Sequence, residues 1–359
     1  MIFGHNRVCG GWEGRMMGIR HLTCSITAGM ALLALATPVL AQTKIRFAIE
    51  GSLNGVHAPL ALAQERGFYK AEGVEVALDA SPTPEALARV ANGAADMALA
   101  DINTLVRLRE QTPGVPLKAI FIVYNKPAYA VIARKSRGIA RPKDLEGKRI
   151  GAPPGEMASA VFPAFAKLNE IDLSKVKIDN VAAAIREPML AAGQIDAVTG
   201  TFFAAFINLK ERGVPLDDLV VLQMADYGLP LYGDAIIVNT AFAKDHPQAV
   251  KGLLRAYTKA LRETIRSPAR AVDAVIKQNE AAKKDIEVER LRMAINESIV
   301  TEDVQAQGLG EIDAARFERG LELLTQTFKL KSKPEPSDIF DDAFLPPEAE
   351  RRLGPARPG

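Results

Sequence analysis

A short polar segment follows the first predicted strand, and its residue types suit the binding of a small molecule. The segment at residues 50–57 reads EGSLNGVH and follows an apolar run at residues 45–49. Carboxylate, hydroxyl, amide and imidazole groups together supply hydrogen-bond donors and acceptors. Open α/β sheets bind ligands at the carboxyl ends of their strands. We therefore predict four ligand-binding residues here: Glu50, Ser52, Asn54 and His57.

The elements around this segment predict a strand, a helix and a second strand. Pro59 suits the first turn of a helix from Pro59 to Lys70, where its missing N–H costs nothing. Gly73 permits the left-handed turn that ends this unit before a strand opens at Val74. The polar segment thus lies between a strand and a helix.

A second candidate site follows the next strand of the same predicted sheet. Residues 83–92 predict a helix, residues 95–101 a short strand, and residues 102–110 another helix. This alternation indicates a parallel sheet with right-handed crossovers. Asp101 and Asn103 then fall at the same rim as Glu50 and are candidate ligand-binding residues. Asp101 is equally suited to cap the following helix, and the two roles can coexist.

A third candidate segment opens a helix predicted to run through Lys167. Residues 151–155 are rich in glycine and proline, and unpaired N–H groups at a helix start bind polar ligand edges. We take Gly155, Glu156 and Met157 as candidate contacts. The charge of Glu156 would oppose a bare anion, and its alternative role is to stabilise the helix dipole.

The last candidates follow later strands. A helix at residues 183–192 and a strand at residues 195–199 lead to a predicted loop at residues 200–203, which contains Thr201 and Phe202. Aromatic side chains there suit stacking on a planar ligand, although adjacent phenylalanines also suit a core. Tyr232 precedes an apolar strand at residues 234–239 and completes the candidate set.

The sequence contains few of the residue patterns that catalysis or metal binding requires. Beyond residue 41 the chain has no cysteine, and its two histidines, His57 and His246, lie far apart. We find no Ser/His/Asp order, no metal-ligand spacing and no phosphate loop. We therefore predict no catalytic residue, no bound metal and no cofactor.

The first 41 residues have the pattern of an export signal. Arg15 and Arg20 precede an apolar run at residues 26–40, and small residues end it at Ala41. The run is shorter than the ~20 apolar residues of a membrane-spanning helix. The leader holds three arginines and one glutamate, so without it the formal net charge falls from +2 to zero. No basic excess remains to favour nucleic acid.

Four segments together resemble one protein family. They read HAPLALAQERGFYKAEGVEV at residues 57–76, DLEGKRIGAPPGEMASAVFPAFAK at residues 144–167, IREPMLAAGQIDAVTG at residues 185–200, and AFAKDHPQAVKGLLRAYTKALRETIRS at residues 241–267. Their order and spacing resemble the periplasmic solute-binding proteins of the nitrate, sulfonate, taurine and thiamine-pyrimidine ABC uptake systems. The resemblance covers about residues 44–330.

The resemblance implies an α/β, two-lobed periplasmic binding protein fold of type II, with two parallel-core sheets joined by a hinge of two crossings. The expected division is residues 1–41 as signal peptide, 42–126 as the first part of lobe I, 127–230 as lobe II, 231–330 as the helical second part of lobe I, and 331–359 as a C-terminal tail. It also implies a periplasmic monomer that closes on a small-molecule ligand and delivers it to ABC permease and ATPase subunits.

Two other classes of protein remain as alternatives. Thiamine-pyrimidine synthases share the implied fold, but their cysteine-rich motif has no counterpart beyond residue 41. The effector lobes of a transcription regulator would need a helix-turn-helix where the export signal lies. The acidic residues Glu50, Asp101 and Glu156 favour a neutral or nitrogen-bearing organic ligand, such as a pyrimidine, over nitrate or a sulfonate.

Overall fold

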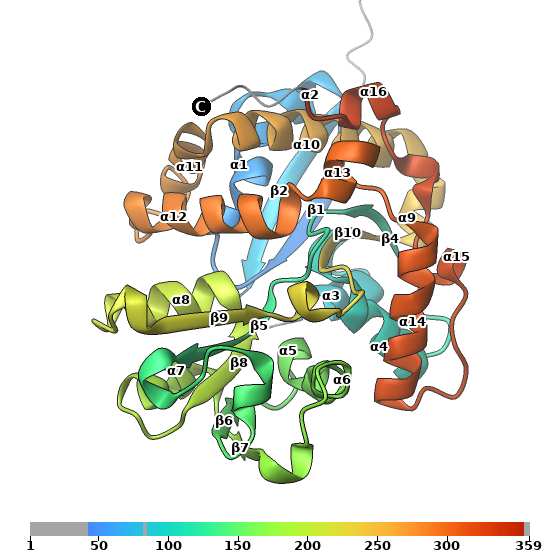
Figure 1. Cartoon of the computed structure of the whole chain (residues 1–359). Coiled ribbons are helices and arrows are strands. Elements are labelled where there is room, and N and C mark those ends of the chain that lie inside the picture. The colour runs from blue at the N-terminus through green and yellow to red at the C-terminus, as the bar shows by residue number, and fades with distance from the viewer. Residues whose placement is uncertain (1–41, 82–84, 355–359) are drawn as a thin grey trace, which may run out of the picture. The chain divides into compact units, whose positions relative to one another are not determined.

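Two mixed five-stranded sheets organise the protein, as the computed structural model in Figure 1 shows. The structure describes residues 42–81 and 85–354, so the predicted export signal lies outside the described residues. The chain divides into residues 1–40 and residues 41–359, and every element below belongs to the second unit. We call each sheet with its covering helices a lobe.

The sheet of lobe I has the order β2-β1-β3-β10-β4. Its strands are β1 (Thr43–Glu50), β2 (Val74–Ser81), β3 (Met97–Asp101), β4 (Leu117–Ile122) and β10 (Asp234–Asn239). Strands β1, β2 and β3 are parallel, whereas β10 runs antiparallel to both β3 and β4. The carboxyl ends of β1 and β3 therefore meet the first residue of β10 at one edge of the sheet.

The sheet of lobe II has the equivalent order β7-β6-β8-β5-β9. Its strands are β5 (Tyr129–Arg134), β6 (Arg149–Ala152), β7 (Lys177–Asn180), β8 (Ala197–Thr201) and β9 (Leu219–Gln223). Strands β6, β7 and β8 are parallel, and β5 is the antiparallel strand. The chain passes between the sheets twice, from β4 to β5 and from β9 to β10. These findings confirm the predicted two-lobed α/β fold with a parallel core in each sheet.

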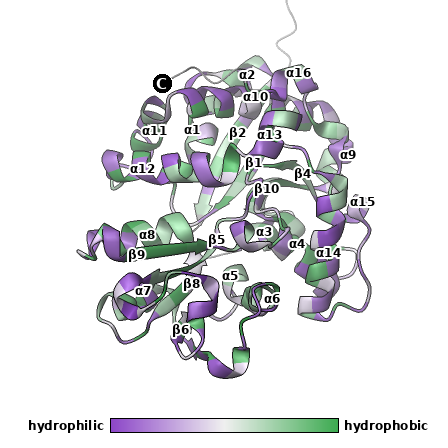
Figure 2. Ribbon diagram, in the orientation of Figure 1, coloured by the Kyte–Doolittle hydropathy of each residue, from purple (hydrophilic) through white to green (hydrophobic). Residues whose placement is uncertain are grey.

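The helices cover the faces of both sheets. Those of lobe I are α1 (Ala58–Glu65), α2 (Phe68–Ala71), α3 (Ala86–Ala91), α4 (Ile102–Gln111), α9 (Thr240–Asp245), α10 (Pro247–Arg266), α11 (Pro268–Ile276), α12 (Lys284–Ala294), α13 (Glu302–Gln307), α14 (Ala314–Phe328), α15 (Pro336–Ile339) and α16 (Glu348–Arg351). Those of lobe II are α5 (Met157–Ala160), α6 (Phe162–Leu168), α7 (Ala183–Ala191) and α8 (Phe202–Glu211). Figure 2 shows apolar residues on the strands and a polar outer face on helices such as α10 and α12.

Two local predictions require correction. The helix predicted from Pro59 to Lys70 is two helices, α1 and α2, because Gly67 adopts a left-handed conformation with φ of 67°. The predicted loop at residues 200–203 does not exist, because β8 continues to Thr201 and α8 begins at Phe202. Both phenylalanines of that segment therefore lie in the first turn of a helix.

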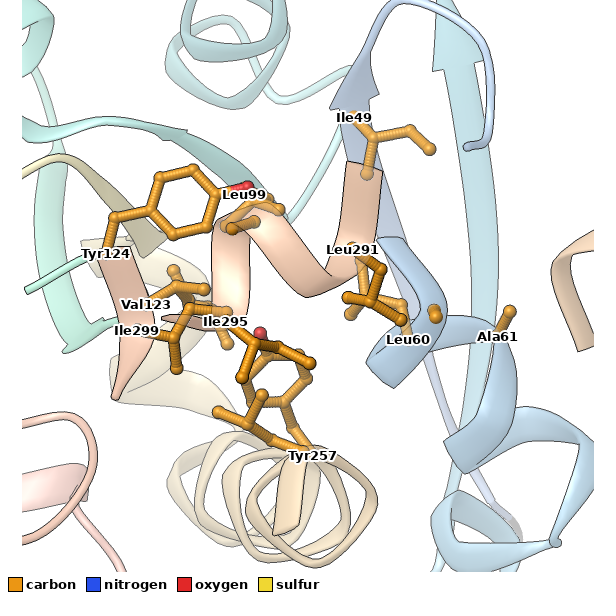
Figure 3. Packing of buried hydrophobic residues seen from close by; sticks show 14 of the residues in the cluster. Ile49, Leu60, Ala61, Leu99, Val123, Tyr124, Tyr257, Leu291, Ile295 and Ile299 are labelled. Atoms are coloured by element: carbon orange, nitrogen blue, oxygen red, sulfur yellow. The ribbon is translucent and has the colours of Figure 1, made fainter. Parts of the chain in front are cut away.

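A buried apolar cluster supports the edge of the lobe I sheet. Figure 3 draws Leu291 of α12, which lies beside Leu60, together with Tyr257 of α10, Ile49 and Leu99. All five belong to one core cluster. Ile49 is the residue before the end of β1, and Leu99 lies two residues before the end of β3. The packing of both side chains therefore holds the ends of the two strands in the core.

Candidate functional site

A cavity of about 240 Å³ lies between the two sheets and has walls from both lobes. This volume is below the usual range of about 300–1,000 Å³ for ligand pockets. Lobe I and the chain crossings contribute the polar residues Glu50, Asn54, His57, Asp101, Tyr124 and Asp234, together with Arg290. Lobe II contributes Tyr129, Thr201 and Phe203. The cavity thus lies where the carboxyl ends of β1 and β3 face the second sheet.

Three carboxyl groups face this cavity. Glu50 ends β1, Asp101 ends β3, and Asp234 begins β10 directly opposite Asp101. Glu50 keeps an exposed surface, and partial loss of hydration at the cleft, with the charge of Asp101, raises its pKa to about 7. Burial, with the charges of Asp101 and Glu50, raises the pKa of Asp234 well above its ordinary value. The three groups therefore resist simultaneous ionisation.

Asp101 joins the two lobes through a hydrogen-bond network. The Tyr129 hydroxyl of lobe II donates to Asp101 Oδ2 and accepts from Asn103 Nδ2 at 2.8 Å. The other Asp101 oxygen accepts the Thr104 N–H at 2.7 Å and so caps α4. Burial raises the pKa of Asp101 despite these bonds, and burial beside Asp101 raises the pKa of Tyr129, which keeps the phenol a donor.

The turn that opens α1 presents a neutral histidine to the cavity. The Asn54 N–H donates to His57 Nδ1 at 3.2 Å, so the hydrogen of the neutral imidazole lies on Nε2. Burial, with the charge of Arg290, lowers the pKa of His57 to about 4. Glu287 accepts from the Gly55 N–H at 2.7 Å and from Arg290 Nε at 3.0 Å, which ties the turn to α12.

Tyr124 brings an unused polar group to the same cavity. Its side chain is 3% exposed, and its hydroxyl has no hydrogen-bond partner among the described residues. Its ring packs edge-on against Phe203 of lobe II, with centroids 6.3 Å apart. The main chain here is held by a bond from the Gly233 N–H to the Tyr124 carbonyl at 2.9 Å. The phenol is therefore fixed at the chain crossing.

The structure brings five of the predicted residues to the cavity. These are Glu50, Asn54, His57, Asp101 and Thr201. Four further wall residues did not emerge from the sequence, namely Tyr124, Tyr129, Asp234 and Arg290. Phe203 also lines the cavity and belongs to the segment in which we considered aromatic stacking. Asp234 begins the predicted apolar strand at residues 234–239, a signal that would have identified it, and Tyr124 lies just after β4. Arg290 lies within a long helix and gives no such signal.

Four predicted residues of lobe I and α8 lie away from the cavity walls. Ser52 is exposed in the segment before Asn54. Asn103 is buried behind Tyr129. Phe202 faces a different groove. Tyr232 is buried, and its hydroxyl accepts the Asp313 N–H at 2.8 Å.

The third predicted segment, Gly155, Glu156 and Met157, also does not line the cavity. Glu156 occupies the N-cap position of α5 without a side-chain capping bond, and it pairs with Arg186. Arg186 also binds Glu187, with Nε 2.8 Å from Oε1. Met157 is buried in the core of lobe II. The charge of Glu156 is thus neutralised within lobe II.

A second, larger groove of about 610 Å³ separates α8 and β9 from α12. Polar contacts cross it, because Lys210 Nζ lies 2.7 Å from Glu289 and Gln223 Nε2 donates to Glu297 at 3.0 Å. The carboxylates of these two glutamates are therefore already paired across the groove, whereas the 240 Å³ cavity holds carboxyls with few partners.

Among residues 42–81 and 85–354, no helix combines the length and apolarity that a membrane crossing requires. The same part of the chain contains no group of three His, Cys, Asp or Glu side chains placed to hold a metal ion.

Comparison with known proteins identifies the family. The NMT1/THI5 like family model matches residues 54–271, which is more than half of the chain. The chain belongs to the NMT1/THI5 like family. This confirms the resemblance read from the four sequence segments.

Members and neighbours of this family have more than one activity. The chain is 28% identical over 243 residues to the 4-amino-5-hydroxymethyl-2-methylpyrimidine phosphate synthase of Schizosaccharomyces pombe, covering 64% of this chain and 68% of that protein. It is 25% identical over 320 residues to the riboflavin-binding protein RibY of Chloroflexus aurantiacus, covering 87% and 88%. The periplasmic aliphatic sulphonate binding protein SsuA of Escherichia coli shares the fold, with a TM-score of 0.64, 12% identity, and coverage of 82% and 96%.

Proposed function

We propose that this protein is the solute-binding component of an ABC importer. It captures a small nitrogen-bearing organic solute, of which a pyrimidine is one example, between its two lobes. It then presents the solute to a membrane permease and its ATPase. In this proposal the protein is an exported periplasmic monomer, and it releases the solute unchanged.

One observation carries this proposal: side chains from both lobes line one small cavity, and two chain crossings connect the lobes within the described residues. A solute that contacts both walls binds the closed arrangement better than the open one. A ligand shifts a conformational equilibrium only through such a difference in affinity. Moving the population from 1:99 to 99:1 requires about 5.5 kcal/mol of preference for the closed state.

The composition of the cavity walls supports capture over chemistry. Tyr124, Tyr129 and Phe203 provide aromatic surface, and the three carboxyls provide acceptors for N–H groups. His57 is held neutral and is hydrogen-bonded through Nδ1 to its own turn, so it is available as a donor from Nε2. These groups can orient a heterocycle, and each has a binding role without any bond being formed.

A thermal-shift screen of the purified protein tests the proposal. The panel contains pyrimidines, flavins, sulfonates, nitrate and aromatic acids. We expect a compound that raises the Tm also to reduce the radius of gyration in solution scattering, and to be recovered intact after prolonged incubation. Asp101→Asn should remove the Tm shift. Asp217→Asn makes the same change at an exposed position outside the cavity and should leave it unchanged.

The alternative is an enzyme of the thiamine-pyrimidine synthase type, which the name of the Schizosaccharomyces pombe relative motivates. Mass spectrometry of the incubated compound separates the two functions. Formation of a new product would contradict the transport proposal, as would binding with no compaction in solution scattering.

A further inference from the structure

The charges around the cavity do not balance. Three carboxyls face it, from Glu50, Asp101 and Asp234, and the one guanidinium in its walls belongs to Arg290. Arg290 Nε is already bonded to Glu287 at 3.0 Å. Among the described residues, no donor forms a hydrogen bond to the Asp234 carboxylate. The described walls of the cavity thus hold more acidic groups than cationic ones.

The arrangement of two of these carboxyls suits a shared cation. Asp101 and Asp234 are directly opposite each other on antiparallel strands, so their side chains lie on the same face of the sheet. Opposed residues of such a pair have Cβ atoms about 4.5–5.5 Å apart, and like charges there are destabilising. A cation with several N–H groups placed between the two carboxylates would reverse this repulsion and form charge-assisted hydrogen bonds to both.

Tyr124 supplies an independent observation. Its hydroxyl is buried and has no partner among the described residues, and Tyr124 itself lines the cavity. A buried polar group without a partner costs about 1–3 kcal/mol. Its oxygen can accept a further N–H from the same cation, whereas the Tyr129 hydroxyl is already engaged with Asp101. The aromatic rings of Tyr124, Tyr129 and Phe203 favour a flat, delocalised cation over a compact ammonium group.

We propose that the captured solute carries a planar amidine-type cation, and that this group binds between the carboxylates of Asp101 and Asp234 within reach of the Tyr124 hydroxyl. This inference rests on the proposed capture function and specifies its ligand class. The volume of about 240 Å³ limits the solute to a small molecule.

The competing occupant of the same cavity is a neutral molecule that accepts hydrogen bonds from protonated carboxyls. The two occupants differ in pH dependence, because a cation requires the carboxylates to be ionised. Binding of a cation should therefore strengthen as the pH rises, because Asp101 and Asp234 have raised pKa values and lose their protons only above the ordinary range. The titratable and charged groups facing the cavity from all its elements are Glu50, His57, Asp101, Tyr124, Tyr129, Asp234 and Arg290.

Benzamidine, benzamide and benzoate form a suitable probe set, because they match in size and shape and differ in charge. We expect benzamidine to raise the Tm of the full-length protein most, with tighter binding at pH 8 than at pH 6 and release of protons on binding. Asp234→Asn and Asp101→Asn should each weaken benzamidine binding at least 10-fold, and Tyr124→Phe a few-fold. Asp217→Asn is the control with unchanged binding.

Several outcomes would overturn the cationic assignment. They are an equal or larger Tm shift with benzamide or benzoate, binding of benzamidine that weakens as the pH rises, and no shift with benzamidine. Circular dichroism of each variant separates loss of binding from loss of folding. Compaction around benzamide would reject the cation and retain the capture function. Binding of benzamidine without compaction, or its hydrolysis, would reject the capture function and retain the charge preference.

Discussion

Asp101 and Asp234 are cross-strand partners at the edge of the lobe I sheet, and both carboxyl groups belong to the walls of the cavity. Asp101 is anchored by the Thr104 N–H and the Tyr129 hydroxyl. Asp234 has no comparable hydrogen bond among the described residues. Two opposed carboxyl groups at a sheet edge lower the stability of the fold. We attribute the presence of this unfavourable pair to a role in ligand binding.

The first prediction follows from this pair. Asp234→Asn should stabilise the unliganded protein at pH 8 by about 0.2–1 kcal/mol, because it removes one of two opposed charges. The pKa of Asp234 is raised in the folded state, so its cost appears as the pH rises above the unfolded value of about 3.9. Denaturant unfolding at pH 8 should show the gain, and at pH 3.5 the gain should disappear. A variant less stable than the parent at pH 8 would contradict the repulsion.

The second prediction concerns Glu50. Its carboxyl should titrate with a pKa of about 7, and Asp101→Asn should lower that pKa without restoring the ordinary value, because loss of hydration is the larger cause. The folded pKa lies above the unfolded one, so stability declines as the pH rises towards 7. Carbon NMR of the glutamate carboxyls measures the pKa directly. Glu50→Gln should remove this decline, and titration of Glu50 near 4.5 in the parent would refute the prediction.

The third prediction concerns the contacts between α8 and α12. Lys210 lies 2.7 Å from Glu289, and Lys283 Nζ lies 3.3 Å from Glu211 Oε1, so both ion pairs connect the lobes. Replacing both lysines by alanine should weaken capture of any compound found in the screen. At ~0.2–1 kcal/mol for each pair, the expected rise in Kd is about 2- to 30-fold.

Isothermal titration calorimetry measures this change in Kd. Lys277→Ala is a matched control, because the pair of Lys277 with Glu65 at 2.8 Å lies within lobe I. Raising the salt concentration should reduce the difference between the parent and the double variant, since exposed ion pairs are screened. Equal effects of the control and the double variant would show that the interlobe position is irrelevant.

The fourth prediction tests the turn that holds His57. A Cβ atom on Gly55 would lie 2.2 Å from the Glu287 carbonyl oxygen, so Gly55→Ala must displace the turn from α12. We expect a loss of about 1–3 kcal/mol in stability, together with weaker ligand binding. Chemical denaturation and the thermal-shift response measure the two effects. Gly354→Ala, where a Cβ meets no atom within 4 Å, should change neither. A stable Gly55→Ala variant that still binds would show that the turn is dispensable.

The local sequence pattern was sufficient to find those cavity residues that lie at the end of a strand. The apolar runs before Glu50 and Asp101 identified β1 and β3, and the carboxyl ends of parallel strands share one edge. The same reasoning was insufficient for Glu156. Its position at a helix start resembled a binding site, but Arg186, thirty residues later, neutralises its charge. A local pattern contains no information about such a distant partner.

By itself, the sequence determined the two-lobed α/β fold and the family, because both depend on the order of apolar runs, turns and motifs along the chain. Only the tertiary structure decided the composition of the cavity. The pairing of β10 with β3 places Asp234 opposite Asp101, the first chain crossing places Tyr124, and packing of α12 against the turn at Gly55 places Arg290. These contacts join residues far apart in the chain, and the local pattern of one strand does not say which strand will pair with it.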